Sequence, residues 1–351
     1  MNSAAEVDSH PQSSVCNSQP HGIGRAVALD GLCAWNNLGR NVVFADEALR
    51  PLAVFDESDF AEDEPSQYDL DVHAILELPG AGIVVVLNHL GMLRAFHAEE
   101  IRRPGPLRRV RPVWTRTFAA DVERALVVGA RLVGSRPREE HAGGLLVSEP
   151  LTATADDDAV DVSVQLETWG RITALAALAA DAEHLVFGGE GRVSRAPVTE
   201  HGVGQPRWVV DVDFQPAALL WDGAIVWAAG SERSPTAIDD YDWEAIRGGG
   251  FAGLDPTDGH VLVSGRFPED LAWGTGGAAV VMIPGALCAI GRMGELHVFD
   301  QRDGSAMTVT APIADHSLGI AHATAVGDHV VYGFNRGGYR LHALAMSAIV
   351  L

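Results

Sequence analysis

A short hairpin pattern recurs along this chain and limits its possible folds more than any other feature. Each copy has an apolar strand, a three-residue turn, a glycine and a second strand, and five copies end at Gly39, Gly91, Gly191, Gly294 and Gly338. Three places before that glycine stand only asparagine or glycine, namely Asn36, Asn88, Gly188, Gly291 and Asn335. These two residue types enter left-handed backbone at the lowest cost, so the pattern predicts hairpins with left-handed residues at this position.

Two weaker copies, with glycines at Gly143 and Gly250, complete a series whose successive spacings run from 44 to 59 residues. Four-stranded propeller blades repeat at about 40–50 residues. The predicted fold class is therefore all-β, a seven-bladed β-propeller of four-stranded antiparallel blades. Residues 1–20 are polar and serine-rich, which predicts a disordered tail, and residues 21–351 are expected to form a single propeller domain.

The strands of each blade are labelled a to d from the propeller axis outward. In blade 2 they are predicted at His73–Leu78, Gly82–Asn88, Met92–Ala98 and Leu107–Trp114. The alanine-rich segment Thr173–Ala182 has some helical character, but its place in the repeat predicts strand a of blade 4. The last blade runs out of chain after its third strand, so the N-terminal region should complete it by pairing with Ala343–Leu351.

The three cysteines, Cys16, Cys33 and Cys288, do not form the paired framework of a disulfide-rich or zinc-binding domain. Cys33 and Cys288 both stand six places before their marker glycine, in blades 1 and 6. We therefore expect them to share a blade position, to be buried and reduced, and to lie far apart.

The formal net charge is −22, and every one of the 25 cationic side chains is arginine. This charge disfavours nonspecific binding to nucleic acid or to an anionic membrane, because both need a basic surface. The N-terminus lacks a basic start followed by an apolar run, and no long apolar stretch occurs, so we expect neither export nor a transmembrane helix. These expectations place the protein in the cytoplasm.

Charge is distributed unevenly along the chain. Asp56–Asp71 holds eight carboxylates and no base, whereas Arg102–Arg111 holds five arginines and no acid. The simplest interpretation is two solvated loops. The alternative is a pair of docking surfaces for charged partners.

Two segments, Ala252–Val263 and Leu296–Gly304, resemble repeats of the quinoprotein-like (PQQ-repeat-like) β-propeller superfamily. Blades of that family end in an aliphatic–Asp–x–x–Thr–Gly turn that leads toward a docking tryptophan. Here Asp-Gly replaces Thr-Gly, and Val263 stands in the place of the tryptophan. The resemblance implies the propeller fold, and the family includes non-enzymatic assembly and scaffold proteins. The family's quinone-binding residues are not found in this sequence, so we expect no cofactor.

In a four-stranded propeller the b–c and d–a loops lie on one face, and the repeat assigns the chemically distinctive residues to that face. The candidate ligand or partner residues are His89, Trp169, Asp240, Tyr241, Asp242, Trp243, Trp273, Thr275, Asn335 and Arg336. Four residues on or beside this face, Trp273, His316, His322 and Arg336, are expected to cluster around the mouth of the propeller axis.

The insertion Ser231–Arg247 in blade 5 is long for a b–c connection. Tyr241 and Trp243 stand there among aspartates, and aromatic anchors in a charged frame are typical of protein–protein contacts. A lid over an axial pocket and an inert surface loop are the alternatives. The glycines of Trp273–Gly277 would let a ligand or another chain approach the backbone, unless they only form a tight turn.

His316 and His322 flank the entry to the first strand of blade 7. A metal site would need a third ligand, and no fixed spacing supplies one, so we expect no metal. Arg336 and Arg171 carry guanidinium groups suited to a carboxylate or a phosphate. Alternatively, these arginines are solvated or paired between blades.

Catalytic motifs are missing: the sequence has no Gly-x-Ser-x-Gly, no glycine loop before a helix and no His-Glu-x-x-His. It therefore predicts a binding or scaffold module that holds another protein on the face of b–c and d–a loops. The alternative is an enzyme with an axial pocket on that face. There His316 or His322 would serve as base or metal ligand, and Arg336 and Arg171 would bind a small anionic substrate.

Overall fold

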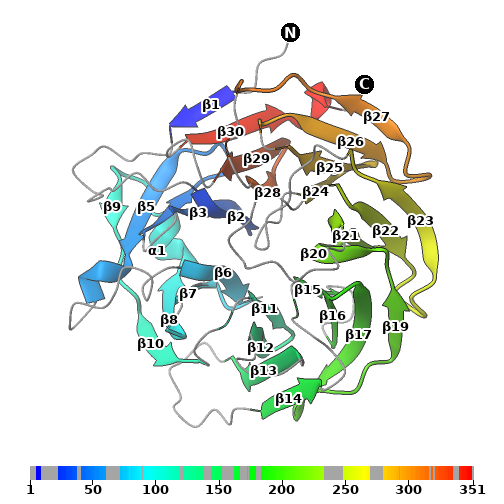
Figure 1. Cartoon of the computed structure of the whole chain (residues 1–351). Coiled ribbons are helices and arrows are strands. Elements are labelled where there is room, and N and C mark those ends of the chain that lie inside the picture. Colours follow the sequence, from blue (N-terminus) through cyan, green and yellow to red (C-terminus); the bar gives the residue numbers. More distant parts are fainter. Residues whose placement is uncertain are drawn as a thin grey trace. The chain divides into compact units, whose positions relative to one another are not determined.

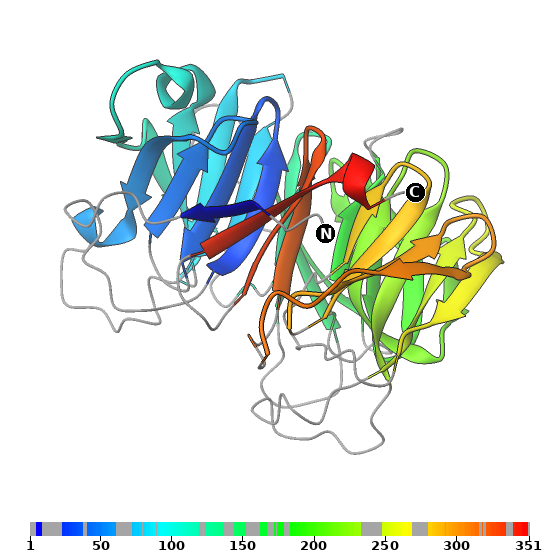
Figure 2. The ribbon, with the colours of Figure 1, turned by 90° about the horizontal axis from the view of Figure 1, so that it is seen from above.

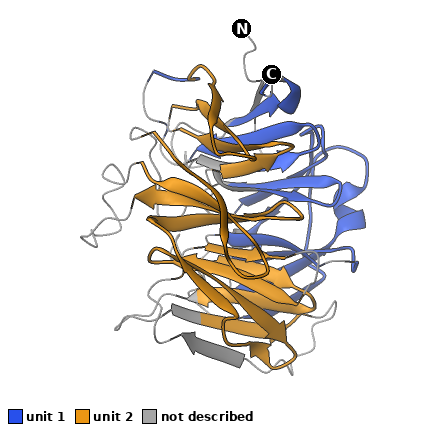
Figure 3. Cartoon of the chain, turned by 90° about the vertical axis from the view of Figure 1, so that its right-hand side faces the viewer, with its two compact units in different colours: residues 1–121, 152–157, 313–351 blue, residues 122–151, 158–312 orange. Residues whose placement is uncertain are grey.

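The structure is a computed structural model of the 351-residue chain. It describes residues 5–8, 23–37, 41–60, 72–78, 80–88, 90–118, 122, 124–136, 144–151, 162–166, 172, 174–178, 183–232, 248–268, 280–291, 293–315, 318, 321–334 and 340–349. Seven small sheets account for most of these residues, as Figure 1 shows. The sheets fall into two compact units, which Figure 3 colours separately.

Unit 1 comprises residues 1–121, 152–157 and 313–351 and contains three sheets. Blade 1 has the order β2 (Ile23–Leu29), β3 (Leu32–Asn37), β4 (Asn41–Ala45), β5 (Pro51–Asp56) and β9 (Arg108–Arg109). Blade 2 has the order β6 (Val72–Leu78), β7 (Ile83–Asn88), β8 (Met92–His97) and β10 (Trp114–Thr117). Blade 7 has the order β28 (Ala321–Val326), β29 (His329–Phe334), β30 (Arg340–Ala345) and β1 (Ala5–Asp8). Short helices are η1 (Glu57–Phe60), α1 (Ala98–Arg102) and η3 (Met346–Ala348).

Unit 2 comprises residues 122–151 and 158–312 and contains four sheets. Blade 3 has the order β11 (Arg124–Val128), β12 (Arg131–Arg136), β13 (Gly144–Pro150) and β14 (Val162–Leu166). Blade 4 has β15 (Ala174–Ala177), β16 (His184–Gly189), β17 (Arg192–Thr199) and β18 (Gly202–Val203), with β19 (Trp208–Asp211) also paired to β17. Blade 5 has β20 (Phe214–Trp221), β21 (Val226–Glu232), β22 (Gly250–Leu254) and β23 (Val261–Arg266). Blade 6 has β24 (Val280–Ile283), β25 (Ala286–Ile290), β26 (Leu296–Asp300) and β27 (Ala306–Val309).

These seven antiparallel sheets confirm the predicted seven-bladed β-propeller. Ala174–Ala177 forms strand β15, so the choice of strand over helix in this alanine-rich segment is also confirmed. The b strands are buried along most of their length: every residue of β7 and of β16 is buried. A strand buried on both faces needs a continuous apolar run, which is why these segments do not alternate between apolar and polar residues.

The N-terminal region pairs with the last strand of the chain, as predicted. β1 lies antiparallel to β30, with Ala5 opposite Ala343 and Asp8 opposite Arg340, and Figure 2 shows the two side by side. The strand begins and ends earlier than expected, at Arg340 and Ala345 instead of Ala343 and Leu351. β1 therefore lies within residues 1–20, which the sequence assigned to the tail.

The outer strand of blade 2 is displaced from its predicted position. The predicted range Leu107–Trp114 is wrong, because the strand that pairs with β8 is β10. The chain first forms α1 and then β9, which pairs parallel with β5 of blade 1. The basic run Arg102–Arg111 thus lies between β8 and β10, but it crosses to the edge of the neighbouring blade.

The left-handed residues of the hairpins are not the predicted ones. In blades 2 and 6 the marker glycines themselves, Gly91 and Gly294, have positive φ of 78° and 85°. Blade 4 closes with a two-residue turn, Glu190 and Gly191, at φ of 49° and 73°. Asn36 and Asn88 belong to strands and do not have positive φ, so the sequence-based prediction for them was wrong.

Cys33 and Cys288 are both fully buried, free thiols, as predicted. Burial raises the pKa of each thiol to about 12. They do not share a blade position, however. The pairing of c and d strands has a bulge just before Ala45 in blade 1 and just before Phe299 in blade 6. Cys33 lies opposite Ala45, the residue just after the bulge, whereas Cys288 lies opposite Val298, the residue just before it.

We predict that neither thiol reacts in the native protein. The thiolate is the reactive species, and burial disfavours it at both sites. Titration with a thiol reagent in native buffer should leave Cys33 and Cys288 unlabelled, and both should react after denaturation. Labelling mapped by mass spectrometry distinguishes them from Cys16, which lies outside the described residues. Fast native labelling of either thiol would contradict the burial described here.

Candidate functional site

The predicted partner face falls almost entirely outside the described part of the chain. This applies to His89, Trp169, Arg171, Asp240, Tyr241, Asp242, Trp243, Trp273, Thr275, His316, Asn335 and Arg336. His322 belongs to strand β28 by its backbone, but its side chain is not described. The predicted cluster of these residues around the axis therefore stays a prediction. What the structure does describe is the set of residues from which several of these loops start.

Two asparagines at the loop starts connect blades 1 and 2 of unit 1. The Asn36 side-chain amide, at the end of β3, donates to the Val72 carbonyl of β6 at 3.2 Å. The Asn88 amide, at the end of β7, donates to Glu57 Oε1 at 2.6 Å. Both side chains are buried, at 2% and 1% exposure, so these bonds are formed away from water. Asparagine is used here for its side-chain amide and not for its tolerance of left-handed backbone.

In blades 4 and 6 the repeat position of these asparagines is taken by Gly188 and Gly291, and the missing side chain makes room for a neighbouring residue. A Cβ on Gly188 would lie 2.9 Å from Pro216 of the next blade. A Cβ on Gly291 would lie 2.0 Å from the carboxylate of Glu295. The restriction to asparagine or glycine therefore has a packing cause: the side chain either bonds across the blade interface or must be absent.

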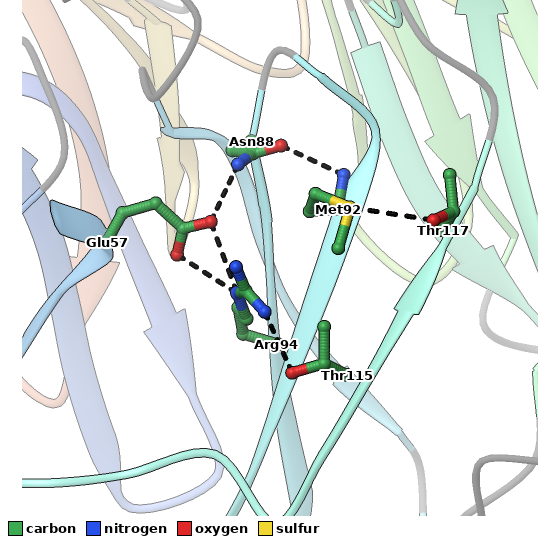
Figure 4. Close-up of polar contacts among 6 residues, drawn as sticks. All are labelled: Glu57, Asn88, Met92, Arg94, Thr115 and Thr117. Carbon is green, nitrogen blue, oxygen red and sulfur yellow. Dashed lines mark hydrogen bonds and ion pairs between the residues drawn. The ribbon is translucent and has the colours of Figure 1, made fainter. Parts of the chain in front are cut away.

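A buried carboxylate lies at the centre of the interface between blades 1 and 2, and Figure 4 shows its contacts. Glu57, the first residue of η1, has a side chain with no exposed surface. Arg94 of β8 donates through Nε to both Glu57 oxygens, at 3.2 and 3.3 Å, and through Nη1 to Thr115 Oγ1 at 3.0 Å. Asn88 completes the cluster, because its Oδ1 accepts from the Met92 backbone N–H at 2.9 Å.

The position of this cluster relates it to the predicted partner face. Glu57 opens the acidic d–a connection between blades 1 and 2, and Asn88 immediately precedes the b–c turn at His89. Burial raises the pKa of Glu57, and the opposing effects of Arg94 and Asn88 do not cancel that rise. The group is closed to solvent and so suits no catalytic exchange of protons. Its geometry fixes where two loops leave the body of unit 1.

A second buried pair supports the b–c turn of blade 6. Glu295 Oε2 accepts from the Met293 backbone N–H at 3.1 Å, and His297 Nε2 lies 3.6 Å from Glu295 Oε1. Burial alone would raise the pKa of Glu295, but the neighbouring His297 imidazole and hydrogen bonds from backbone N–H groups outweigh it and lower the pKa. The Glu295 and His297 side chains are 10% and 8% exposed, so both are buried. This carboxylate occupies the space that glycine leaves at position 291.

The basic run is largely occupied within unit 1. Arg109 donates to both oxygens of Asp59 at 2.7 Å, and Arg103 pairs with Glu100 at 2.6 Å. Arg108 donates to backbone carbonyls, among them that of Ile101 at 3.1 Å. Arg109 thus links β9 to η1 at the end of blade 1, whereas Arg103 and Arg108 bond within their own segment. The pairs of Arg109 and Arg103 are partly exposed, so whether this run docks a partner stays a prediction.

The two turns that resemble quinoprotein repeats make equivalent contacts with the preceding blade. In blade 5, Gly259 has φ of +79°, and a Cβ there would lie 2.6 Å from Val210 and 2.8 Å from Trp208 of blade 4. Trp208 Nε1 also donates to the Pro256 carbonyl at 3.0 Å. In blade 6, Gly304 lies against Val263, the residue that stands in the tryptophan's place. A docking contact therefore exists in both blades, once with tryptophan and once with valine.

The described residues contain no group of three or more histidine, cysteine, aspartate or glutamate side chains placed to hold a metal ion. No helix among the described residues has the length and apolar character needed to cross a membrane.

Comparison with known proteins finds likeness in three-dimensional structure. No protein-family model matches the chain, and no curated protein matches its sequence. The β-propeller domain of Cps50 (Swd1) from Myceliophteria thermophila superposes with a TM-score of 0.61 at 11% identity, covering 92% of this chain and 96% of that one. The computationally designed Ika8 protein gives a TM-score of 0.54 at 12% identity, covering 94% and 98%.

BamB from Moraxella catarrhalis is a third similar structure, with a TM-score of 0.52 at 13% identity, covering 92% of this chain and 87% of that one. At identities this low, a shared fold says nothing of a shared activity, because one fold carries many functions. The comparisons therefore identify the chain as a β-propeller and leave its function to be argued from its own residues.

Proposed function

We propose that this protein is a binding module for another protein, and that the partner sits on the b–c and d–a loops. The observation that carries the proposal is the way loop ends are fixed in unit 1. Asn36, Asn88 and Glu57 lie where three of these loops meet their strands, and all three bond across the interface of blades 1 and 2. Variable loops held at fixed points on a rigid body are the usual construction of a binding surface.

The insertion of blade 5 is held in a similar way. β21 continues to Glu232, and Gly248 and Gly249 return the chain with φ of 59° and 102°. A Cβ on Gly249 would lie 2.0 Å from the Gly230 carbonyl, so the two ends of the insertion are in close contact. The segment between them, residues 233–247, carries Asp240, Tyr241, Asp242 and Trp243. We infer that this segment supplies the aromatic anchor of the interface.

The relation to the quinoprotein-like superfamily belongs to the same proposal. It is supported by the docking contacts of Gly259 and Gly304 and by the structural likeness to BamB. On this proposal the propeller works without a quinone, as a scaffold.

The first test removes the insertion. Replacing residues 233–247 by Asn-Gly, a sequence suited to a tight hairpin turn, should leave the thermal unfolding midpoint nearly unchanged, because the strands close at Gly230 and Gly250 without the insertion. Shortening a surface loop changes closure entropy by only about 0.6 kcal/mol per halving. The deletion should abolish capture of the protein partner, measured by quantitative mass spectrometry of pull-downs from native lysate with both forms as bait.

A point substitution sharpens this test. Trp243→Ala should weaken the captured partner's affinity by about 2 kcal/mol or more if the indole is a hot spot. Trp243→Phe keeps an aromatic ring and should retain most of the affinity. If capture survives both the deletion and Trp243→Ala, while a small-molecule affinity or a catalytic rate collapses, the insertion is a lid and the enzyme with an axial pocket replaces this proposal.

A further inference from the structure

Blade 1 carries a fifth strand, which shows what the outer edge of a blade in this protein can bind. β9 runs parallel to β5, with Arg108 opposite Ala53 and Arg109 opposite Val54. The Val110 N–H donates to the Val54 carbonyl at 3.0 Å. Leu107 and Val110, on either side of the two arginines, pack partly buried against the core of unit 1. An extended segment of the pattern apolar–basic–basic–apolar therefore covers this edge.

Blade 6 has the equivalent edge, and no further strand among the described residues covers it. Its c and d strands are interrupted by a bulge before Phe299, as those of blade 1 are before Ala45. Relative to this bulge, Val309 in β27 occupies the position that Val54 occupies in β5 of blade 1. Among the described residues β27 pairs with β26 alone, so its outer edge has no strand beside it.

The backbone at this edge is set to receive a strand. The Thr310 N–H donates to the Leu296 carbonyl at 2.9 Å, which makes Val309 and His297 a non-hydrogen-bonded pair. In such a pair the N–H and C=O point away from the partner strand. Val309 thus directs both groups outward, in the way Val54 directs its carbonyl toward Val110.

The side chains at this edge are apolar and exposed. Met307 is 41% and Val309 is 55% exposed, and no charged residue occurs from Gly304 to Ala314. Exposed edge strands usually carry charges that discourage pairing with another chain. In blade 5 the equivalent residue is Ser264, and its backbone carbonyl lies against Gly304 of blade 6. In the part of the chain that the structure describes, the edge of blade 6 has neither a charged side chain nor a further paired strand.

Charge indicates what would occupy this edge. Among its described residues, unit 2 exposes nine carboxylates and three arginines, and the whole chain has a net charge of −22. A second copy of the chain would bring the same negative charge, which opposes self-association. A basic segment of another protein is attracted, and β9 shows that such a segment fits the backbone.

We propose that β27 binds an extended basic segment of a partner protein by parallel strand addition. The segment's backbone pairs with Val309, and its flanking apolar side chains cover Met307 and Val309. Main-chain bonds of this kind give affinity, and side chains on alternate positions give specificity. This surface is separate from the loops of the proposed function and stands without them.

The probe is a capped peptide with the sequence of residues 105–112 of this chain, which contains β9. Its binding to the full-length protein is measured by fluorescence anisotropy. Val309→Pro removes the outward N–H without touching the bonds to β26, a place where an edge strand tolerates proline. Val309→Lys adds a repelling charge. Each should weaken binding at least tenfold, and amide exchange in residues 305–310 should slow when the peptide is bound.

The matched control is Val209→Lys on β19, whose side chain is 49% exposed on the outer strand of blade 4. It should bind the peptide within about twofold of the wild type. A peptide with glutamate at both arginines of β9 should not bind. The proposal is overturned if the peptide fails to bind, if Val209→Lys weakens it as much as Val309→Lys, or if the Val309 variants bind normally. Dimerisation that Val309→Lys abolishes would also overturn it, because the occupant would then be a second copy.

Discussion

Replacing Glu57 by alanine should lower the free energy of unfolding by about 3–5 kcal/mol, the usual cost of removing one partner from a buried ion pair. The carboxylate is fully buried and accepts bonds from Arg94 and Asn88, so its loss removes the acceptor of the Asn88 amide and of Arg94 Nε. The exposed pair of Asp59 and Arg109 in the same unit provides the control. Asp59→Ala should cost less than about 1 kcal/mol. Urea unfolding curves measure both values.

The pH dependence gives this prediction a second test. Burial raises the pKa of Glu57, so the folded state holds the proton more tightly than the unfolded chain does. Stability contributed by this group therefore falls as pH rises from the ordinary glutamate value, about 4.3, toward the raised one. Glu57→Gln lacks that titration. The stability of the wild type relative to Glu57→Gln should be greatest near pH 4 and should decline toward neutral pH. A difference that grows with pH would contradict a raised pKa.

Gly259→Ala should also be strongly destabilising, by about 3 kcal/mol. Its φ of +79° costs an alanine about 1–2 kcal/mol. The new methyl would in addition overlap Trp208 and Val210, and overpacking of this kind costs about 1–3 kcal/mol.

Gly285 separates the two causes, because its φ of +81° is nearly the same and a Cβ there would meet nothing within 4 Å. Gly285→Ala should therefore cost only about 1 kcal/mol, from backbone strain alone. Unfolding curves of the two variants give the packing contribution of the Gly259–Trp208 contact as their difference. Equal losses in both variants would show that the contact between blades 4 and 5 contributes nothing.

The repeat was sufficient to predict the fold because hairpin chemistry is local. Marker glycines such as Gly91 and Gly294 do occupy left-handed turns, and their spacing locates the blades. The conformation of Asn36 and Asn88 was predicted wrongly because their role depends on a neighbouring blade. The strand of β9 was missed for a similar reason. Two arginines have no strand pattern of their own, and only pairing with β5 makes them a strand.

The buried cluster of Glu57 was hidden by composition. In the sequence Glu57 is one of eight carboxylates in an acidic stretch, and such stretches are usually solvated. The available signal was Arg94, a charged residue within the strand that runs Met92–His97. A charge that a strand carries toward the core needs an opposite charge nearby. The sequence does not say which of the eight carboxylates supplies that charge. The predicted partner residues lie in loops, whose conformations no local pattern determines.

The central claim, that a protein partner rests on the b–c and d–a loops, is tested most directly by hydrogen–deuterium exchange of the captured complex. The predicted result is slower exchange in residues 233–247 and 269–279, and in the turn at residues 335–339, when the partner is bound. The a–b turns at Gly223 and Gly285 should exchange at the same rate in the free and bound protein. Protection of those turns, with the three loop segments unchanged, would contradict the account.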